Sequence, residues 1–514
     1  MMKLRLKIPE RLKCIFSSHS KSAEDYKPEI HGPLVSFAPP DGAEEVERYW
    51  VDEPCAFISI IYNNNEYLYN VIEPELNAFE KLVLEEVHDE LRDIISFDID
   101  EIEKLDRCKL IREKTEKACL EYADLNPVSF EKVFYYIKRD FIEFKELSAL
   151  MRDQFLEDIW CNGVDIPIHV FHKAYGAICT NITIKSEDEL NSFAMYLAQQ
   201  SGYHLSASNP IVDASMRDGS RINITYGREI SPKGSSFSIR RFRKKPLTPV
   251  DLVAWKTFSS ELMAYFWLCV ENRKNIIISG GTASGKTASL NAVSMFIPSN
   301  LRIVTLEDTR EIQLPHINWV PMVTRDSTSV DGRGGVDFHY LLRTSLRQRP
   351  EYLLVGEVRG EEAQILFQAM NTGHITFSTL HAGSVTEVLN RLTNPPINVP
   401  VAMFSALDII CMQGIAYELG GEKRRVKIVA EVTEVSKEIK TKEAFIWNPH
   451  KDEFEFKGSK VLEEIRDKHG WSEAELSVEL EQRKNFLEKM ILRGIRDYED
   501  VSSWINSYRK NPKI

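Results

Sequence analysis

Eight consecutive residues carry the clearest chemistry in this sequence. They are Gly280, Gly281, Thr282, Ala283, Ser284, Gly285, Lys286 and Thr287, and they match the glycine-rich phosphate loop that ends in Lys-Thr. The glycines allow successive backbone N–H groups to surround the β- and γ-phosphates of a nucleotide. Lys286 adds positive charge, and the Thr287 hydroxyl is placed to ligate Mg²⁺. The segment therefore predicts binding of ATP with Mg²⁺.

Acidic residues follow two further runs that read as buried strands. Residues 301–306 lead into Glu307 and Glu311, and residues 352–356 lead into Glu357. The carboxyl ends of parallel strands are where ligands bind in open α/β sheets, so one acid of the first pair is a candidate to polarise an attacking water. Apolar residues followed by an acid are typical of a Walker B segment, whose carboxylate reaches Mg²⁺ through water.

Two histidines, His374 and His381, stand at opposite ends of a fourth predicted strand. Their separation of seven residues is not a metal-ligand spacing. They are either core or edge histidines, or one of them senses the γ-phosphate. Only the neighbouring motifs favour the second interpretation.

The elements around these residues are in the order that the phosphate loop requires. Residues 275–279 form a short apolar run before the loop, and the residues after Thr287 read as a helix. A helix is expected to begin at Thr248-Pro249 and to run toward Glu271. Beyond it strands and helices alternate, which predicts a parallel α/β sheet. Charged amphipathic helices are expected from Lys460 onward.

The N-terminal half divides into parts of different character. Residues 1–45 read as a loosely held basic arm, either a solvated tail or a contact for acidic lipid or a partner. An α+β domain is expected over 46–150, with a hairpin of residues 56–63 and 66–72. A sheet-rich domain with a helix at 188–201 is expected over 151–242. A hinge at 243–247 precedes the α/β domain of residues 248–514.

Composition limits the protein class. The 514 residues are 43% hydrophobic and 28% charged, and the formal net charge is -12. Such an acidic balance argues against a protein that coats nucleic acid. The eight cysteines contain no C-x-x-C pair, which indicates neither a zinc site nor a disulfide framework. Because no apolar run approaches the ~18 residues of a membrane helix, a cytoplasmic protein is expected.

The motifs in their order resemble the secretion ATPase superfamily, which powers type IV pili, type II and type IV secretion, and the archaellum. The resemblance spans roughly residues 155–407. TLEDTREIQL resembles the Asp box of that family, LRQRPEYLLVGEVRG its Walker B segment, and TGHITFSTLHA its His box. The upstream segments YWVDEPCAFISIIYN, YNVIEPEL and LEDIWCNGVDIPIHVFH resemble the archaeal branch.

The resemblance implies a C-terminal RecA-like ATPase domain preceded by α+β N-terminal domains, of which the sheet-rich one is PAS-like. It makes Glu307 or Glu311 the general base, Glu357 the Mg²⁺-linked acid and His381 a phosphate sensor. Arg221 and Arg240 fall where the family places arginines that project into the nucleotide site. For Arg240 the alternative is a hinge arginine in solvent.

The resemblance also implies partners. It makes the chain a ring-forming motor, a hexamer, that acts at the inner face of the membrane on a polytopic platform protein. Nucleic acid is not expected. A nucleic-acid translocase needs a basic, aromatic-rich channel, and a small-molecule kinase needs an acceptor pocket. A nucleotide-gated scaffold is hard to reconcile with intact Lys286, Thr287, Glu307 and Glu357.

Overall fold

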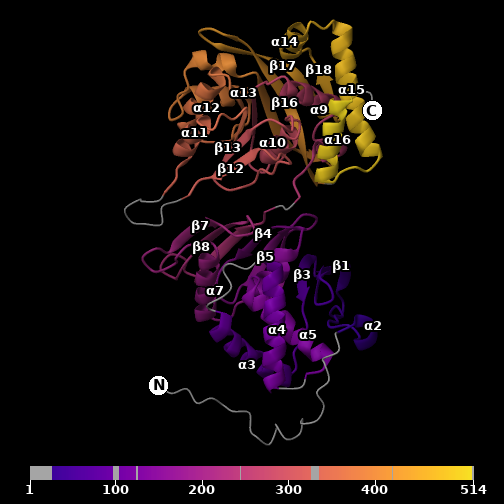
Figure 1. Ribbon diagram of the computed structural model, residues 1–514, viewed down its shortest axis with the longest axis vertical. Coiled ribbons are helices and arrows are strands. Elements are labelled where there is room, and N and C mark those ends of the chain that lie inside the picture. Colours follow the sequence, from indigo (N-terminus) through magenta and orange to yellow (C-terminus); the bar gives the residue numbers. More distant parts are fainter. Residues whose placement is uncertain are drawn as a thin grey trace, which may run out of the picture. The chain divides into compact units, whose positions relative to one another are not determined.

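The computed structural model describes residues 26–95, 104–122, 125–242, 245–325, 335–418 and 421–511. The chain divides into two compact units, Met1–Phe242 and Arg243–Ile514, drawn in Figure 1. Most of the predicted basic arm, residues 1–25, lies outside the described residues, as do Arg243 and Lys244 of the predicted hinge.

A nine-stranded sheet forms the centre of the first unit. Its strands are hydrogen-bonded in the order β1-β2-β3-β6-β5-β4-β9-β8-β7. Neighbours are antiparallel except for the parallel pair β3–β6. The strands are β1 (Glu44–Asp52), β2 (Ala56–Asn63), β3 (Glu66–Ile72), β4 (Leu156–Cys161), β5 (Pro167–His172), β6 (Gly176–Thr183), β7 (Ile211–Ser215), β8 (Arg221–Thr225) and β9 (Ser236–Arg240).

The sequence predicts a domain boundary at residue 150, between the α+β domain and the sheet-rich domain. The parallel pair β3–β6 joins strands from the two sides of this boundary. The hairpin β2–β3 forms as predicted, and Leu68 on β3 pairs with Cys179 on β6. The Asn181 side chain extends this contact, since it accepts from Val71 N and donates to Val71 O, both at 2.9 Å. One hydrophobic core then includes Ile58 and Ile239. Strands from 46–150 and from 151–242 therefore belong to one sheet.

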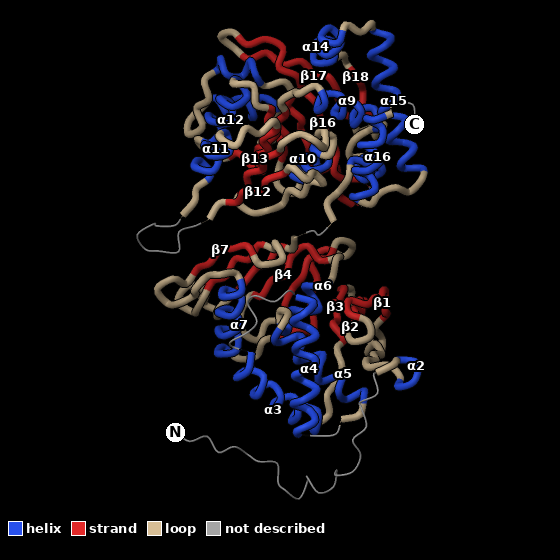
Figure 2. Tube along the Cα trace, viewed as in Figure 1, coloured by secondary structure: helices blue, strands red, loops and turns tan. Residues whose placement is uncertain are grey.

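The helices of the first unit lie mainly between β3 and β4 in the sequence. Three of them, α3, α4 and α5, pack against one another around a separate small core, and Figure 2 shows them as a group of blue tubes. The predicted helix at 188–201 is α7, which packs on the main core. The helices are α2 (Pro28–His31), α3 (Ala78–Ile95), α4 (Lys104–Tyr122), α5 (Pro127–Phe141), α6 (Ser148–Arg152) and α7 (Glu187–Gln200), with a 3₁₀ turn at Lys145–Leu147.

A second nine-stranded sheet forms the centre of the other unit, in the order β12-β11-β13-β14-β10-β15-β16-β17-β18. The expected parallel arrangement holds from β12 to β15. The pairs from β15 to β18 are antiparallel, because their connections are too short for a crossover. The strands are β10 (Ile276–Gly280), β11 (Ile303–Glu307), β12 (Trp319–Val323), β13 (Tyr352–Val358), β14 (Ile375–Leu380), β15 (Ile409–Glu418), β16 (Gly421–Val435), β17 (Ile439–Asn448) and β18 (Glu453–Phe456).

Helices cover both faces of this sheet, as expected when parallel strands are buried. Ile276 and Ile278 of β10 face one core with α9 and α10, whereas Ile277 faces a second core with α12 and α13. The helices are α8 (Pro249–Ala254), α9 (Ser260–Glu271), α10 (Lys286–Ser294), α11 (Phe338–Leu346), α12 (Glu362–Asn371), α13 (Val385–Thr393), α14 (Lys460–His469), α15 (Glu473–Leu492) and α16 (Tyr498–Lys510), with a 3₁₀ helix at Val401–Ala406.

The single helix predicted from Thr248 to Glu271 is wrong. Two helices, α8 and α9, occupy this range. Lys256 adopts a φ of 58°, which a right-handed helix cannot contain, and the Ser259 side chain accepts from Leu262 N to begin α9. The predicted C-terminal helices are α14, α15 and α16, and they are anchored through Glu271 at the end of α9. Its carboxylate accepts from Arg483 and from Arg509, each at 2.8 Å.

Within the described ranges, no helix combines the length and apolar character that crossing a membrane requires. The four strands β10, β11, β13 and β14 run parallel, so their carboxyl ends meet at one edge of the sheet. That edge brings together the phosphate loop, Glu307, Glu357 and His381.

Candidate nucleotide site

The phosphate loop connects β10 to α10 in the predicted strand–loop–helix order. Ala283 and Gly285 adopt φ values of 58° and 92°, and the second is a conformation that favours glycine. Ser284 Oγ donates to Gly281 O at 2.9 Å. A Cβ added at Gly280 would lie 2.2 Å from the Gln413 carbonyl oxygen on β15, so glycine is also required where the loop leaves the sheet.

Lys286 points back over the loop and toward the end of β14. Its Nζ donates to Gly281 O at 2.9 Å and lies 3.3 Å from His381 Nδ1. Burial lowers the pKa of the Lys286 ammonium, while the nearby Glu357 and Glu311 carboxylates raise it. The lysine charge therefore lies in an acidic environment at the carboxyl edge of the sheet.

His381 links Lys286 to the predicted Walker B acid. Its Nε2 lies 2.8 Å from Glu357 Oε1, and burial together with the Lys286 charge lowers the pKa of His381. Both effects favour the neutral imidazole. His374 lies at the other end of β14, beside Thr372, so the structure separates the two histidines and brings only His381 to the loop.

Glu357 is held at the end of β13 by a cation as well as by His381. Arg359 donates to its Oε2 through Nε at 3.0 Å and through Nη2 at 2.5 Å. The other oxygen, Oε1, is buried and lies 2.8 Å from His381 Nε2. A carboxylate at this edge of the sheet can also accept from a metal-bound water.

The residues present fit the Mg²⁺ ion that the phosphate loop implies. Thr287 lies in the first turn of α10, directly after Lys286, and offers a hydroxyl oxygen. Oxygen ligands and retained waters are what Mg²⁺ prefers. Thr287 would bind the ion directly and Glu357 through water.

Glu307 and Glu311, which the sequence could not distinguish, occupy different environments. Glu307 is 2% exposed, and its Oε1 accepts from the backbone N–H groups of Glu311 and Ile312, both at 2.8 Å. Burial raises the pKa of the Glu307 carboxyl to about 8. Glu311 is exposed and is close enough to Lys286 to raise its pKa. Glu307 therefore organises the turn, and the exposed Glu311 carboxylate acts on the Lys286 charge.

Arg221 and Arg240 lie in the first unit, directly opposite each other on the neighbouring strands β8 and β9. Arg221 makes a two-bond pair with Asp213, with Nε–Oδ1 at 2.9 Å and Nη2–Oδ2 at 2.6 Å. Arg240 is exposed and pairs in register with Asp158 on β4. The Arg240 charge opposes the effect of burial, which raises the pKa of Asp158. The two arginines thus lie side by side on neighbouring strands of the sheet.

Several residues that contact the site were missed by the sequence reasoning. Arg424 Nε donates to Ala283 O at 2.9 Å, and Arg391 donates to His381 O. Gln413 lies beside the loop in register with Gly280. None of these side chains belongs to a recognisable local motif. Arg424 and Gln413 reach the phosphate loop from strands distant in the sequence, and Arg391 reaches His381 from α13, so spacing offers no signal for them.

Comparisons with known proteins agree with this architecture. The model for type II/IV secretion system proteins matches residues 147–470, and the PilB3-like N-terminal and C-terminal models match residues 5–75 and 450–513. The first match covers more than half of the chain, and it includes the phosphate loop, Glu307, Glu311, Glu357, His381 and Arg240.

Two proteins of related sequence and one solved structure are similar to this chain. An uncharacterized protein of Methanocaldococcus jannaschii is 43% identical over 385 residues, 73% of this chain and 69% of that protein. The type IV pilus assembly ATPase PilB of Pseudomonas aeruginosa is 35% identical over 173 residues, 33% of this chain and 28% of PilB. The crystal structure of the pilus retraction motor PilT with bound ADP covers 70% of this chain and 96% of PilT, at 19% identity and a TM-score of 0.41. Because the matched family model covers more than half of the sequence, the chain belongs to the type II/IV secretion system protein family.

Proposed function

We propose that the protein hydrolyses ATP with Mg²⁺ as a subunit of a ring-forming motor. The motor would power the assembly or movement of a type IV pilus-like filament such as an archaeal pilus or archaellum, or related protein secretion. The observation that carries the proposal is the convergence of Lys286, His381 and Glu357 at one phosphate loop. Membership of a family that includes a pilus assembly ATPase supports the mechanical role.

Each side chain has a distinct task in this proposal. The loop N–H groups and Lys286 hold the phosphates, and bound Mg²⁺ neutralises their charge. Glu311 takes the proton of the attacking water, because it is the exposed acid of the pair and its charge acts on Lys286. Glu307 holds the turn that presents it. His381, which bridges Lys286 and Glu357, senses the γ-phosphate.

Arg221 and Arg240 would complete the site from the first unit. A guanidinium beside the transferred phosphoryl group neutralises charge that develops in the transition state. Because they form a cross-strand pair on β8 and β9, one sheet would present both cations together. Residues 243–247 would serve as the hinge, and the moving units would act on a polytopic membrane protein from its cytoplasmic side.

The test combines ATPase rate, protein concentration and light scattering in the presence of Mg²⁺. We expect specific activity to rise as the ring assembles. Arg240→Ala should lower turnover in the assembled ring by at least tenfold. Arg228→Ala removes an exposed arginine of the same unit, which pairs with Glu187, and should leave turnover unchanged.

Two outcomes would change the proposal. A concentration-independent rate from a monomer, equal in wild type and Arg240→Ala, would leave an ATPase but remove the ring motor. Full activity in Glu311→Gln together with loss in Glu307→Gln at unchanged folding would reverse the roles assigned to these two acids.

A further inference from the structure

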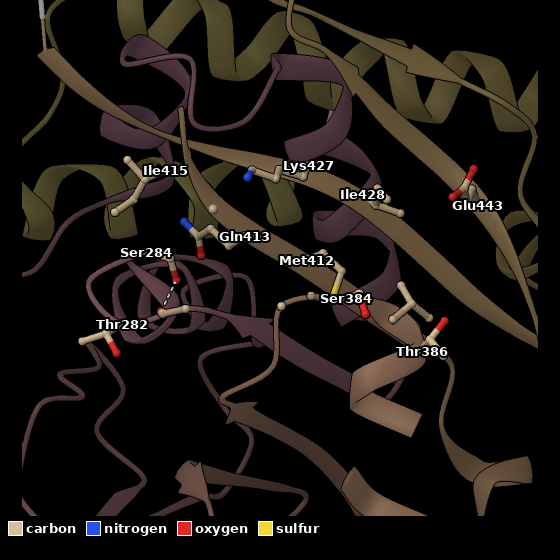
Figure 3. A pocket seen from close by; sticks show the side chains of 14 residues that line it. Thr282, Ser284, Ser384, Thr386, Met412, Gln413, Ile415, Lys427, Ile428 and Glu443 are labelled. Carbon is tan, nitrogen blue, oxygen red and sulfur yellow. Dashed lines mark hydrogen bonds between the residues drawn. The ribbon is translucent and has the colours of Figure 1, made fainter. Parts of the chain in front are cut away.

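A cavity of about 440 Å³ adjoins the phosphate loop, beside the start of α13 and the strands β15 to β17 (Figure 3). Gly281 lines one side of it, and Gly383 and Ser384 line another. Gly281 O accepts from Lys286 Nζ at 2.9 Å, and Gly383 follows His381 by two residues. The cavity therefore adjoins the place where the γ-phosphate of a bound nucleotide would lie.

Gln413 gives this cavity an unmet hydrogen-bonding requirement. The residue lines the cavity and is 4% exposed, and its Oε1 is buried without a hydrogen-bond partner in the described parts of the chain. Figure 3 shows the Gln413 amide among the lining side chains, near the label of Ser284. Because an unpaired buried acceptor is unfavourable, a ligand here should bring an N–H or O–H donor.

Lys427 supplies the cavity with a positive charge. It is the extra residue of a β-bulge in β16, between Val426 and Ile428, which both pair with β15, and such bulges redirect side chains. A Cβ added at Gly414 would lie 2.8 Å from Lys427 Nζ, so glycine leaves room for the lysine to lie across β15. Lys427 has no ion-pair partner within the ranges that the structure describes. Its charge is thus available to a ligand.

The start of α13 adds hydrogen-bond donors to the same wall. Ser384 caps the helix, since its Oγ accepts from Glu387 N at 3.2 Å. Val385 and Thr386 are the first two residues of the helix and also line the cavity, and N–H groups at these positions have no acceptor inside a helix. A helix N-terminus favours an anion. Together with Lys427, these donors indicate an anionic ligand.

The acceptors in the lining limit which anion fits. Gln413 Oε1 and the Glu443 carboxylate can accept from an O–H group, and the carboxylate repels an anion that is fully ionised. Inorganic phosphate keeps at least one proton at neutral pH, whereas sulfate keeps none. The cavity is larger than a bare phosphate ion, so the ion would keep part of its water and bind weakly, as a departing product must.

We propose that this cavity binds inorganic phosphate, the product that hydrolysis releases beside it. Lys427 and the start of α13 bind the phosphate oxygens, and Gln413 Oε1 accepts from the phosphate O–H. This inference rests on the proposed ATPase function. It adds a second phosphate site, separate from the γ-phosphate position at Lys286, that can hold the ion while the loop still holds a nucleotide.

The experiment measures phosphate binding while the loop is occupied. Wild type is saturated with Mg²⁺ and AMP-PNP, whose γ-phosphate is not readily hydrolysed, and binding of radiolabelled phosphate is measured by equilibrium dialysis at about pH 7. We expect about one phosphate per chain, with a Kd of about 1 mM. Sulfate should compete at least about fivefold more weakly, because it has no proton for Gln413 Oε1. In Gln413→Met the two anions should bind with nearly equal affinity.

A pair of lysine variants tests the cation. Lys427→Met should weaken phosphate binding by about threefold or more, because a partly solvated ion pair is lost. Lys437→Met removes an exposed lysine between β16 and β17, outside the cavity lining, and should keep the wild-type affinity. In steady-state assays of wild type, phosphate should inhibit noncompetitively with ATP. The wild-type measurements stand even if a variant fails to fold.

The outcomes separate this inference from the proposed function. If AMP-PNP binds but phosphate does not, or if phosphate inhibits only in competition with ATP, the cavity is not a phosphate site and the nucleotide site stands. Equal affinity of wild type for phosphate and sulfate overturns the role of Gln413 Oε1, and unchanged affinity in folded Lys427→Met overturns that of Lys427. Failure of AMP-PNP itself to bind overturns the proposed function and this inference together.

Discussion

Replacing Glu307 with Gln should change how the stability of the α/β unit depends on pH. Glu307 is almost completely buried, and its Oε1 holds the backbone N–H groups of Glu311 and Ile312. A glutamine carbonyl can accept the same two hydrogen bonds but cannot ionise. The substitution therefore keeps the turn while it removes one titration from the folded protein.

The sign and size of the effect follow from the pKa of Glu307, which burial raises from 4.5 to about 8. Between these values the folded chain keeps a proton that the unfolded chain has released. The stability due to this group is therefore complete below pH 4.5 and is lost as pH rises toward the folded pKa. Linkage gives a loss of about 2.5 kcal/mol between about pH 6 and about pH 9.

The assay is urea unfolding of wild type and Glu307→Gln at both pH values. Tryptophan fluorescence reports mainly on this unit, because six of the eight tryptophans lie in it, among them Trp267, which is buried and stacks on Phe296. We expect the wild type to lose stability relative to the variant by about 2.5 kcal/mol across this interval. Glu438→Gln, which changes an exposed acid, should show the wild-type pH dependence. Identical pH dependence in wild type and Glu307→Gln would refute the reasoning.

Three further predictions concern the same unit. Lys286→Ala should abolish nucleotide binding measured by calorimetry, because the loop loses its charge; near-normal ATPase activity would contradict the phosphate-loop assignment. Glu357→Gln should retain ATP binding but reduce hydrolysis by at least tenfold, since the water-linked metal contact is weakened; lost binding with impaired folding would make Glu357 structural. Glu271→Ala should destabilise the unit by about 1.5–3 kcal/mol in urea unfolding, because Arg483 and Arg509 both lose their hydrogen bonds to this carboxylate while Arg483 keeps Glu479, and a change below about 0.5 kcal/mol would show that α15 and α16 are anchored elsewhere.

Local sequence was sufficient for the features that depend on neighbouring residues. The strand, loop and helix around Lys286 are contiguous, so the order of residue types predicts them directly. Strand ends were recognised at Glu307 and Glu357 for the same reason, and the parallel topology then explains why those ends meet at one edge. The hairpin of residues 56–63 and 66–72 also depends only on a short turn and two apolar runs.

Other features required the tertiary structure because they depend on pairing between distant residues. The joining of β3 to β6 spans more than a hundred residues and rests on the Asn181 amide, which has no local signature. Glu307 and Glu311 are the same residue type four positions apart, and only burial separates the turn-holding acid from the exposed one. Gln413 reaches the phosphate loop because β15 pairs with β10. Amino-acid types thus determined the chemistry available to this protein, whereas burial and strand pairing decided which side chain performs each task.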